Sequence, residues 1–309
     1  MKILGIGNAI VDVICKVNDD FINHNNLTKS TMKLFFDENE FKKLLTNLKI
    51  EKTVSGGSVA NSIVGISQLG DKVGFIGKVS DDEFGRNYED GLKKENVDYF
   101  YSKKKEELPT GTCLILVTPD SERTMCTFLG TAGKIHENDI NSDAIKKSEI
   151  IFLEGYLWDE GEQRKAFDKA INNANKVAMS LSDQFCVDRH KPHFLELVKN
   201  KLDITFANEQ EITSLIEAKD FKEVVNFSKQ INKLIVVTRG EKGAIAIRGE
   251  EISECGVLQN LKILDLTGAG DLFAAGFLHG YVNKLSIKES LEKGTKMSSK
   301  VIQQIGARL

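Results

Sequence analysis

Short apolar runs alternate along the chain with longer segments in which apolar residues recur every three or four positions. A short apolar run is typical of a buried strand, and the longer recurrence is typical of an amphipathic helix. The strands predicted in this way are residues 2–6, 73–76, 149–153, 176–180, 204–207, 234–238 and 244–247. Helices predicted between them include 58–69, 84–95, 161–173 and 221–231. This alternation predicts an α/β fold with a mainly parallel central sheet covered on both faces.

Two parts of the chain break this rhythm, because strand-like runs follow one another there without intervening helices. They are 11–17 with 32–36, and 98–101 with 112–118 and 124–128. We interpret them as one small discontinuous β-lid, formed from about residues 12–36 and 98–130, within a single catalytic domain over 1–309. Ligands of such folds bind at the carboxyl ends of the parallel strands, so the site is expected there.

Composition narrows the class of protein. A length of 309 residues suits one large α/β domain, and the net charge of −3 comes without a basic stretch typical of nucleic-acid binding. The five cysteines are widely spaced and include no C-x-x-C, so neither a disulfide framework nor a zinc site is indicated. No signal-peptide pattern or membrane-spanning apolar run occurs. We expect a cytoplasmic enzyme without nucleic-acid or membrane partners.

The segment Asp265-Leu266-Thr267-Gly268-Ala269-Gly270-Asp271 joins a glycine turn to a helix. Residues 262–264 look like the end of a strand, and from Phe273 onward apolar and glycine residues recur at helical spacing. Free N–H groups and the positive end of the helix dipole meet at this turn and favour an anion. Glycine lets backbone amides approach the anion without a Cβ in between. Asp271 then lies in the first helical turn, beside the anion.

Two interpretations of Asp271 are open. It can be an ordinary favourable charge at a helix start, with Thr267 as the cap. Alternatively, it is a functional carboxylate beside a bound phosphoryl group. The glycines on both sides of Ala269, together with carboxylates at both Asp265 and Asp271, favour the functional interpretation. The motif therefore predicts a kinase for a small hydroxyl-bearing molecule.

Two features near the start of the chain could hold that molecule. Asp12 interrupts a strand-like apolar pattern. It is either an edge-strand residue that faces water or a two-oxygen acceptor for a vicinal diol. Gly56-Gly57 opens the predicted helix 58–69, either as an ordinary helix start capped by Ser58 or as a close approach of backbone to ligand. Two consecutive glycines favour the ligand.

Two features in the second half of the chain could meet a nucleotide. Asn208, followed three residues later by Glu211, has the pattern of a capping box. The same position at a strand's carboxyl end would let Glu211 order a magnesium-bound water, since Mg²⁺ keeps several waters and takes few protein carboxylates. Residues 234–238 and 244–247 predict a hairpin, whose glycine turn 239–243 could lie along ATP phosphates.

Several alternative designs are absent from the sequence. There is no G-x-x-x-x-G-K-[ST] of a P-loop, no H-R-D loop with a D-F-G, no G-x-S-x-G and no H-E-x-x-H. The run Gly5-Ile6-Gly7-Asn8-Ala9-Ile10 lacks the third glycine of a dinucleotide site and precedes a strand-like segment. These absences argue against P-loop, protein-kinase, serine-hydrolase and dinucleotide-binding designs.

In this order along the chain, the motifs resemble the ribokinase/PfkB family of carbohydrate kinases over nearly the whole length. The resemblance rests on Gly7, Asn8 and Asp12, on Gly56-Gly57 with Asn61, on 208–211, on 238–243 and on 265–271. It implies a three-layer α/β/α sandwich with a small β-lid. It also implies ATP and Mg²⁺, with transfer of the γ-phosphoryl group to a hydroxymethyl oxygen.

The resemblance further implies a role for each candidate residue. Asp271 would be the catalytic base, beside an anion hole formed by Gly268, Ala269 and Gly270. The acceptor would be held by Asn8, Asp12, Gly56, Gly57 and Asn61. The nucleotide would meet Asn208, Glu211, Thr238, Gly240 and Gly243, with Glu211 holding Mg²⁺ through water. Asp265 and Thr267 would frame a monovalent cation, such as K⁺, in members that have one.

Within the family, the chain is most similar to adenosine kinases. This similarity rests on 7–12, on 109–113, on Asn61 with Ser62 and on 302–308. Tyr156 and Phe185 fall where such enzymes place aromatic rings around adenine, and stacking suits a planar base. Arg123 falls where an arginine of the lid meets phosphate.

Two acceptors are compatible with these residues. One is adenosine, phosphorylated at its 5′-hydroxymethyl to give AMP, and the other is a free sugar, as in fructokinase- or ribokinase-like members. The aromatic pair favours adenosine, because a free sugar would need more polar contacts. Leu266 and Thr267 stand where many members have Thr-Asn or Thr-Thr. We expect a monomer or a homodimer, since lid edges pair in some relatives and are blocked in others.

Overall fold

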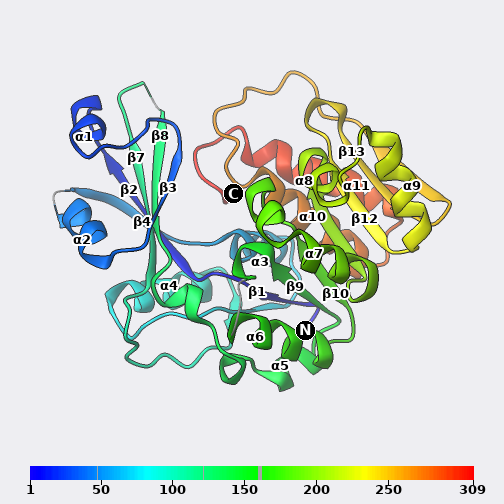
Figure 1. Ribbon diagram of the computed structural model, residues 1–309, viewed down its shortest axis with the longest axis horizontal. Helices are drawn as coiled ribbons and strands as arrows, with labels where there is room; N and C mark the ends of the chain where they lie inside the picture. The colour runs from blue at the N-terminus through cyan, green and yellow to red at the C-terminus, as the bar shows by residue number, and fades with distance from the viewer. Residues whose placement is uncertain (47, 121, 159–161) are drawn as a thin grey trace.

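The computed structural model describes residues 1–46, 48–120, 122–158 and 162–309, and their strands form two sheets (Figure 1). The large sheet has nine strands, in spatial order β14 (Glu251–Cys255), β13 (Ala244–Arg248), β12 (Leu234–Thr238), β11 (Ile204–Asn208), β10 (Val177–Ser180), β9 (Ile150–Glu154), β1 (Ile3–Ile6), β5 (Val73–Ile76) and β6 (Val97–Tyr99). Its strands run parallel from β12 to β6, while β13 and β14 are antiparallel at one edge. The predicted mainly parallel sheet is confirmed, as is the hairpin of β12 and β13.

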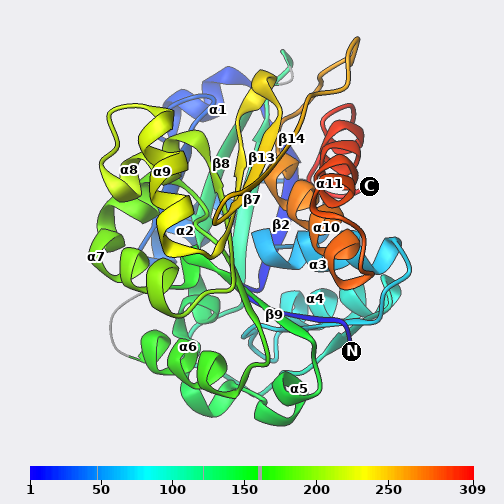
Figure 2. The same ribbon diagram turned by 90° about the vertical axis from the view of Figure 1, so that its right-hand side faces the viewer.

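Helices cover both faces of the large sheet, as Figure 2 shows. One face carries α3 (Ser58–Gln68), α4 (Glu83–Lys94), α10 (Ala269–Val282) and α11 (Ile287–Val301). The other carries α5 (Ser142–Lys146), α6 (Glu162–Asn173), α7 (Gln184–Asn200), α8 (Glu209–Ile216) and α9 (Phe221–Ile231). Neighbouring residues such as Ile3 and Leu4 therefore belong to different cores, yet both are fully buried. Burial on both sides explains why these strands are continuous apolar runs.

The small sheet lies to one side of the large one (Figure 1). Its five strands are, in spatial order, β3 (Met32–Phe35), β8 (Arg123–Phe128), β7 (Gly111–Val117), β2 (Ile10–Lys16) and β4 (Ile50–Gly56). The helices α1 (Asp19–His24) and α2 (Glu38–Thr46) accompany it, and Phe41 of α2 packs its ring 5.5 Å from that of Phe128. We call this sheet with α1 and α2 the small lobe.

Two predictions about the small lobe are wrong. Residues 98–101 do not belong to it, because β6 pairs in parallel with β5 at the edge of the large sheet. The small lobe instead includes β4, which was not predicted as a strand. The first three residues of β4 are exposed, and two of them, Glu51 and Lys52, are charged. The run therefore lacks the apolar pattern of the other strands.

The strand expected at 262–264 is also absent. The backbone N–H of Leu264 donates to the carbonyl of Ile302 at 2.8 Å, so this segment meets the end of α11 rather than another strand. Ile263 and Leu264 are more than half exposed. The strand was predicted because these side chains are apolar, although they are not buried. Of the helix predicted at 161–173, residue 161 lies outside the described residues and the rest is α6.

None of the helices in the described part of the chain combines the length and the apolar character needed to cross a bilayer.

Candidate active site

The glycine turn before α10 leaves the start of that helix open. Gly268 is the N-cap residue with φ of 77°, and no side chain caps the helix. A Cβ at Gly268 would lie 2.6 Å from the Cα of Ala307, so glycine is required there on two counts. The interpretation of Thr267 as the cap is therefore wrong. The uncapped N–H groups of the first turn face a cavity of about 280 Å³ that Gly268, Gly270 and Asp271 help to line.

One member of the expected anion hole is already engaged. The N–H of Ala269 donates to the carbonyl of Leu266 at 3.1 Å. The first i to i−4 bond of the helix runs from Leu272 to Gly268, at 2.9 Å. The N–H groups of Gly270 and Asp271 precede that bond and point out of the helix end. They are the amides best placed for an anion.

Asp271 is held by side chains of α3. Its Oδ1 accepts from the hydroxyl of Ser58 at 2.6 Å, and its Oδ2 accepts from the amide of Asn61 at 3.0 Å. Burial raises the pKa of the Asp271 carboxyl, and these two hydrogen bonds oppose that rise. The N-cap of α3 is Gly57, and Ser58 is the first residue of the helix. The Ser58 hydroxyl donates to Asp271 and does not cap the helix.

Asp12 lies on β2, which pairs with both β4 and β7 and so is an inner strand. The alternative of a water-facing edge residue is therefore wrong. Burial raises the pKa of Asp12 to about 7, while the charge of Arg308 opposes that rise. A Cβ at Gly56 would lie 2.4 Å from Oδ2 of Asp12, and a Cβ at Gly57 would lie 2.2 Å from the carbonyl of Asn8. Gly56 thus makes room for the Asp12 carboxylate, and Gly57 makes room for the Asn8 backbone between β1 and β2.

Sequence reasoning missed Glu154, the last residue of β9, which is only 1% exposed. Its Oε1 accepts from the side-chain amide of Asn8 at 2.9 Å, and its Oε2 accepts from the N–H of Val59 at 3.0 Å. Burial raises its pKa to about 7, against the effect of those two hydrogen bonds. The signal was available, because a carboxylate that ends a fully apolar strand belongs at the ligand-binding edge of the sheet.

Asp265 and Thr267, the residues predicted to frame a monovalent cation, lie in contact with each other. Oδ1 of Asp265 accepts from the hydroxyl of Thr267 at 2.6 Å, and Oδ2 accepts from the N–H of Gly306 at 2.8 Å. Arg123, at the start of β8, pairs with the same Oδ2 at 2.7 Å. Burial alone would raise the pKa of Asp265, but the hydrogen bonds and Arg123 hold it below its usual value. An ion pair therefore joins the small lobe to the α10 turn.

The nucleotide candidates Asn208, Glu211 and Thr238 line the same cavity as Asp271. Asn208 and Glu211 form a capping box at the start of α8. Burial raises the pKa of Glu211 to about 7, although Asn208 donates to both of its oxygens. Gly240 and Gly243 lie in the β12–β13 turn with φ of 56° and 84°. They follow Thr238 along the chain and are not among the residues that line the cavity.

A magnesium ion would be held loosely by these side chains. In the described residues, no group of three or more His, Cys, Asp and Glu side chains is arranged to ligate a metal. Glu211 faces the cavity as a single carboxylate, which fits a magnesium ion that keeps its waters and takes further oxygens from phosphate. Glu211 is the residue that would orient such a water.

The two aromatic candidates follow neighbouring strands of the large sheet. Tyr156 comes after β9, partly buried, and its N–H donates to the hydroxyl of Ser182 at 3.1 Å. Phe185 is in the first turn of α7, after β10, and is 78% exposed. A ring so exposed contributes little to the core.

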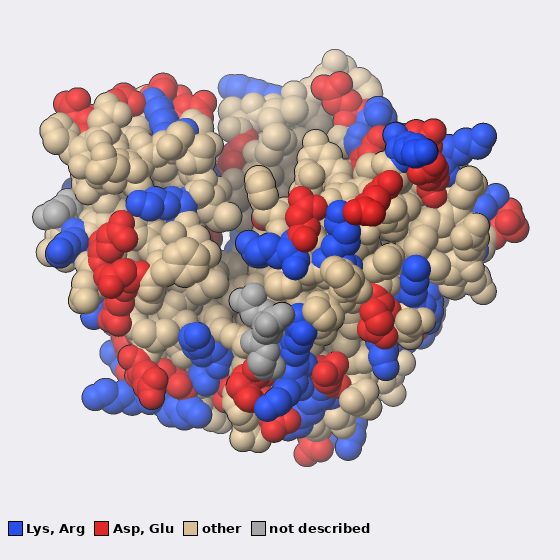
Figure 3. All heavy atoms as spheres, viewed as in Figure 1, with Lys and Arg blue, Asp and Glu red and all other residues tan. Residues whose placement is uncertain are grey.

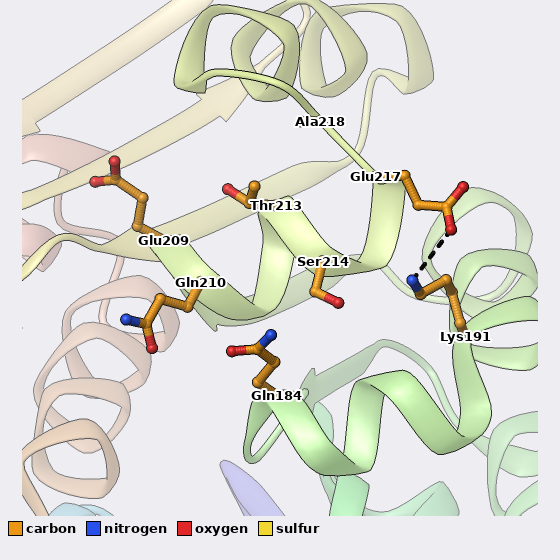
Figure 4. Close-up of a pocket in the computed structure, with 8 residues that line it drawn as sticks. All are labelled: Gln184, Lys191, Glu209, Gln210, Thr213, Ser214, Glu217 and Ala218. Carbon is orange, nitrogen blue, oxygen red and sulfur yellow. Dashed lines mark hydrogen bonds and ion pairs between the residues drawn. The ribbon is translucent and has the colours of Figure 1, made fainter.

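A second hollow, of about 560 Å³, lies between α7 and α8 (Figure 4). Its lining is polar, and Lys191 and Glu217 pair across it at 3.2 Å. None of the predicted site residues lines it. Of the predicted site residues, Asn208, Glu211, Thr238 and 268–271 line the smaller cavity instead. Figure 3 shows the molecule hollowed between the small lobe, at the upper left, and the rest of the chain.

Taken together, the doubly covered sheet, the open start of α10 and the carboxylate beside it define a ribokinase-like phosphotransferase. Comparison with known proteins agrees. Residues 29–309 match the family described as pfkB family carbohydrate kinase. The chain belongs to the PfkB family of carbohydrate kinases. It is therefore a kinase that acts on a hydroxyl of a sugar or nucleoside.

Similar proteins carry two kinds of name. The chain is 36% identical to an adenosine kinase from Sinorhizobium meliloti, with a TM-score of 0.90 and coverage of 100% of this chain and 95% of that one. It is also 36% identical to a probable sugar kinase from Rhizobium etli CFN 42, with a TM-score of 0.88 and coverage of 99% and 94%. A 5-dehydro-2-deoxygluconokinase of Clostridium botulinum (strain Eklund 17B / Type B) is 27% identical over 285 residues, or 86% of this chain and 84% of its own length.

Proposed function

We propose that this kinase transfers the γ-phosphoryl group of ATP to the 5′-hydroxymethyl of adenosine, giving AMP. The observation that carries the proposal is the position of Asp271, at the open start of α10 and bound to Ser58 and Asn61 of α3. A hydroxyl beside Asp271 would be close to Asp271, which acts as the general base, and to the phosphoryl group over the helix N-terminus.

The reaction needs positioning and charge neutralisation more than covalent chemistry. The N–H groups of Gly270 and Asp271 would donate to the transferring phosphoryl oxygens. Asp271 would accept the proton of the attacking hydroxyl late in the transfer, as that oxygen loses basicity. Mg²⁺ would neutralise phosphate charge, with Glu211 orienting one of its waters. A requirement for K⁺ at Asp265 and Thr267 stays a prediction, and Arg123 already supplies a positive charge there.

Adenosine as the acceptor is supported by the aromatic side chains Tyr156 and Phe185, which flank the carboxyl ends of β9 and β10. Phe185 offers an exposed ring on which a planar base could stack. Asp12 would accept hydrogen bonds from the ribose hydroxyls. Asn61 and the Gly56-Gly57 backbone would contact the same sugar. The similarity to the adenosine kinase of Sinorhizobium meliloti over the whole chain supports the same choice.

A second candidate is a kinase for a free sugar, of the fructokinase or ribokinase kind. The names of the Rhizobium etli and Clostridium botulinum relatives favour it. The diol-binding part of the site would serve either acceptor, because both present vicinal hydroxyls beside a hydroxymethyl group.

A coupled assay of ADP release separates the two candidates. Adenosine, ribose, fructose and 5-dehydro-2-deoxygluconate are offered singly, with ATP and Mg²⁺, and kcat/KM is measured for each. We expect adenosine to give the highest value by at least about tenfold, the effect of 1.4 kcal/mol in the transition state. A higher kcat/KM for any of the free sugars would reject adenosine in favour of the second candidate. Analytical ultracentrifugation of the same sample tells monomer from homodimer.

A further inference from the structure

Arg308 lies inside the candidate active site, although it is far from the other site residues in the sequence. Its Nε donates to Oδ1 of Asn61 at 3.0 Å, across 247 positions of the chain. The same Asn61 donates through its Nδ2 to the carboxylate of Asp271. A hydrogen-bonded chain therefore runs from the guanidinium through the amide to the carboxylate.

This chain of hydrogen bonds fixes the orientation of the Asn61 amide. A guanidinium can only donate, so the side of the amide that faces Arg308 must be its oxygen. The amide nitrogen is then turned toward Asp271, where it donates to Oδ2. Without Arg308, the amide could rotate and present its oxygen to the carboxylate, which would repel it.

The backbone around Arg308 is held in place by the phosphate end of the site. Gly306 donates its N–H to Asp265, and Ala307 lies against Gly268, where any Cβ would collide with it. The residues that follow α11 thus run directly over the glycine turn before they enter the site.

Arg308 has hydrogen-bonding capacity left over. Its Nη2 is buried and has no hydrogen-bond partner among the described residues. Buried donors in folded proteins are normally paired, and one that is not calls for a partner. The carboxylates of Asp12 and Asp271 are among the groups whose charges act on Arg308, so the guanidinium is within electrostatic reach of both.

We propose that Arg308 is a positioning residue for Asp271, acting through Asn61, and that its unpaired Nη2 donates to an oxygen of the acceptor's sugar beside Asp12. This role deepens the proposed function and rests on it for the second part. The first part, the orientation of Asn61 toward Asp271, holds for any acceptor.

The kinetic test compares Arg308→Gln and Arg308→Lys with Arg86→Gln, an exposed arginine of α4 that pairs with Asp81. We expect Arg308→Gln to lower kcat/KM for the acceptor about 10- to 100-fold, as for lost hydrogen bonds from a charged donor. Arg308→Lys keeps the charge but not the fork, and should recover only part of the loss. The KM for ATP should stay within about twofold of the wild type, because Arg308 does not line the nucleotide side.

The second test needs no acceptor. The Asp271 carboxyl is titrated by ¹³C NMR in the wild type and in both Arg308 variants, with Asp271→Asn for assignment. Other titratable groups act on Asp271 or on Arg308, and they include Asp12, Glu154, Tyr156, Tyr88 and Glu95. Loss of the guanidinium should move the Asp271 titration to higher pH, because a nearby positive charge and a donated hydrogen bond both favour the ionised form.

The outcomes separate the two proposals. If the wild type phosphorylates none of the acceptors, the proposed function fails, and the NMR titration still decides the role of Arg308. An unchanged Asp271 titration and unchanged acceptor kinetics in Arg308→Gln would overturn the inference. So would a parallel loss for ATP and acceptor that follows the unfolded fraction in a thermal melt. If Arg308→Gln does not fold, the same comparisons are made with Arg308→Lys.

Discussion

The two ends of the candidate site are built in different ways. At the phosphate end, the turn, the open helix start and Asp271 come from one stretch, 265–271, although Ser58 and Asn61 of α3 hold the Asp271 carboxylate. At the acceptor end, Asn8, Asp12, Glu154 and Arg308 come from separate parts of the chain and meet through tertiary contacts. One continuous segment thus forms the backbone of the phosphate end, whereas tertiary contacts assemble the acceptor end.

The charges at the two ends differ only in part. The phosphate end offers N–H groups to an anion, and its Asp265 is held ionised by neighbouring donors. At the acceptor end, burial raises the pKa of both Asp12 and Glu154 to about 7. Buried carboxylates of this kind cost stability and are retained where a ligand uses them. Buried carboxylates with a raised pKa therefore lie at both ends of the site, because burial also raises the pKa of Asp271 and raises that of Glu211 to about 7.

Asp271→Asn tests the point where the two ends meet and should have the largest effect. The amide keeps the shape but cannot take a proton, so kcat should fall about 10²-fold or more while the fold is kept. ADP release and thermal unfolding are measured on the same preparation. Asp90→Asn, at an exposed position of α4, is the control and should behave as the wild type. Near-normal turnover of Asp271→Asn would remove it from the catalytic role.

This difference also explains what could be predicted from the sequence. The glycine turn and helix start at 265–271 could be predicted from local spacing. The capping box of Asn208 and Glu211 and the β12–β13 hairpin could be predicted in the same way. The hydrogen bonds of Asp271 to Ser58 and Asn61 span 213 and 210 positions and leave no local pattern. For the same reason β4 escaped prediction, because its pairing with β2 rather than its own apolar pattern makes it a strand.

Asp12→Asn tests the acceptor end and should have the next largest effect. The acceptor kcat/KM should fall about 30- to 100-fold, as expected when a charged hydrogen-bonding partner is removed. Stability should move the other way. Burial raises the pKa of Asp12 from 3.8 to about 7, so between those pH values the unfolded chain ionises and the folded one does not. The wild type therefore loses stability as pH rises through this window, and the penalty is complete above pH 7.

The stability part is measured as the difference in Tm between Asp12→Asn and the wild type at pH 5 and at pH 8. The difference should be larger at pH 8, by about 1.5 °C for each kcal/mol of penalty removed. The exposed Asp90→Asn is measured in parallel as the control for removal of one carboxylate. An equal difference at both pH values would mean that Asp12 is not strained in the free protein.

Two glycine substitutions contrast the ends directly. A Cβ at Gly56 would meet Oδ2 of Asp12 at 2.4 Å, whereas a Cβ at Gly270 would meet nothing within 4 Å. Gly56→Ala should therefore displace Asp12 and lower acceptor kcat/KM about tenfold. Gly270→Ala should leave acceptor KM unchanged and stabilise α10 by up to about 1 kcal/mol, since alanine is the better helix former.

Gly270→Ala should impair only phosphoryl transfer and so lower kcat, because its new methyl group stands where the anion approaches the backbone. Gly256→Ala is the matched control, at a position with open space and no part in the site. If Gly56→Ala and Gly270→Ala altered the same kinetic parameter, the division into two ends would be wrong.

Phe185→Ala should have the smallest effect and sharpens the comparison within the acceptor end. Phe185 is 78% exposed, so its loss should change the free energy of unfolding by less than about 0.5 kcal/mol. If adenine stacks on the ring, the KM for adenosine should rise roughly 3- to 10-fold, the value of one aromatic contact, and that for a free sugar should not change. Phe36→Ala, at a position 87% exposed after β3, is the matched control. Equal KM values for adenosine in Phe185→Ala and the wild type would mean that the acceptor end recognises its substrate by Asp12, Asn61 and Arg308 alone.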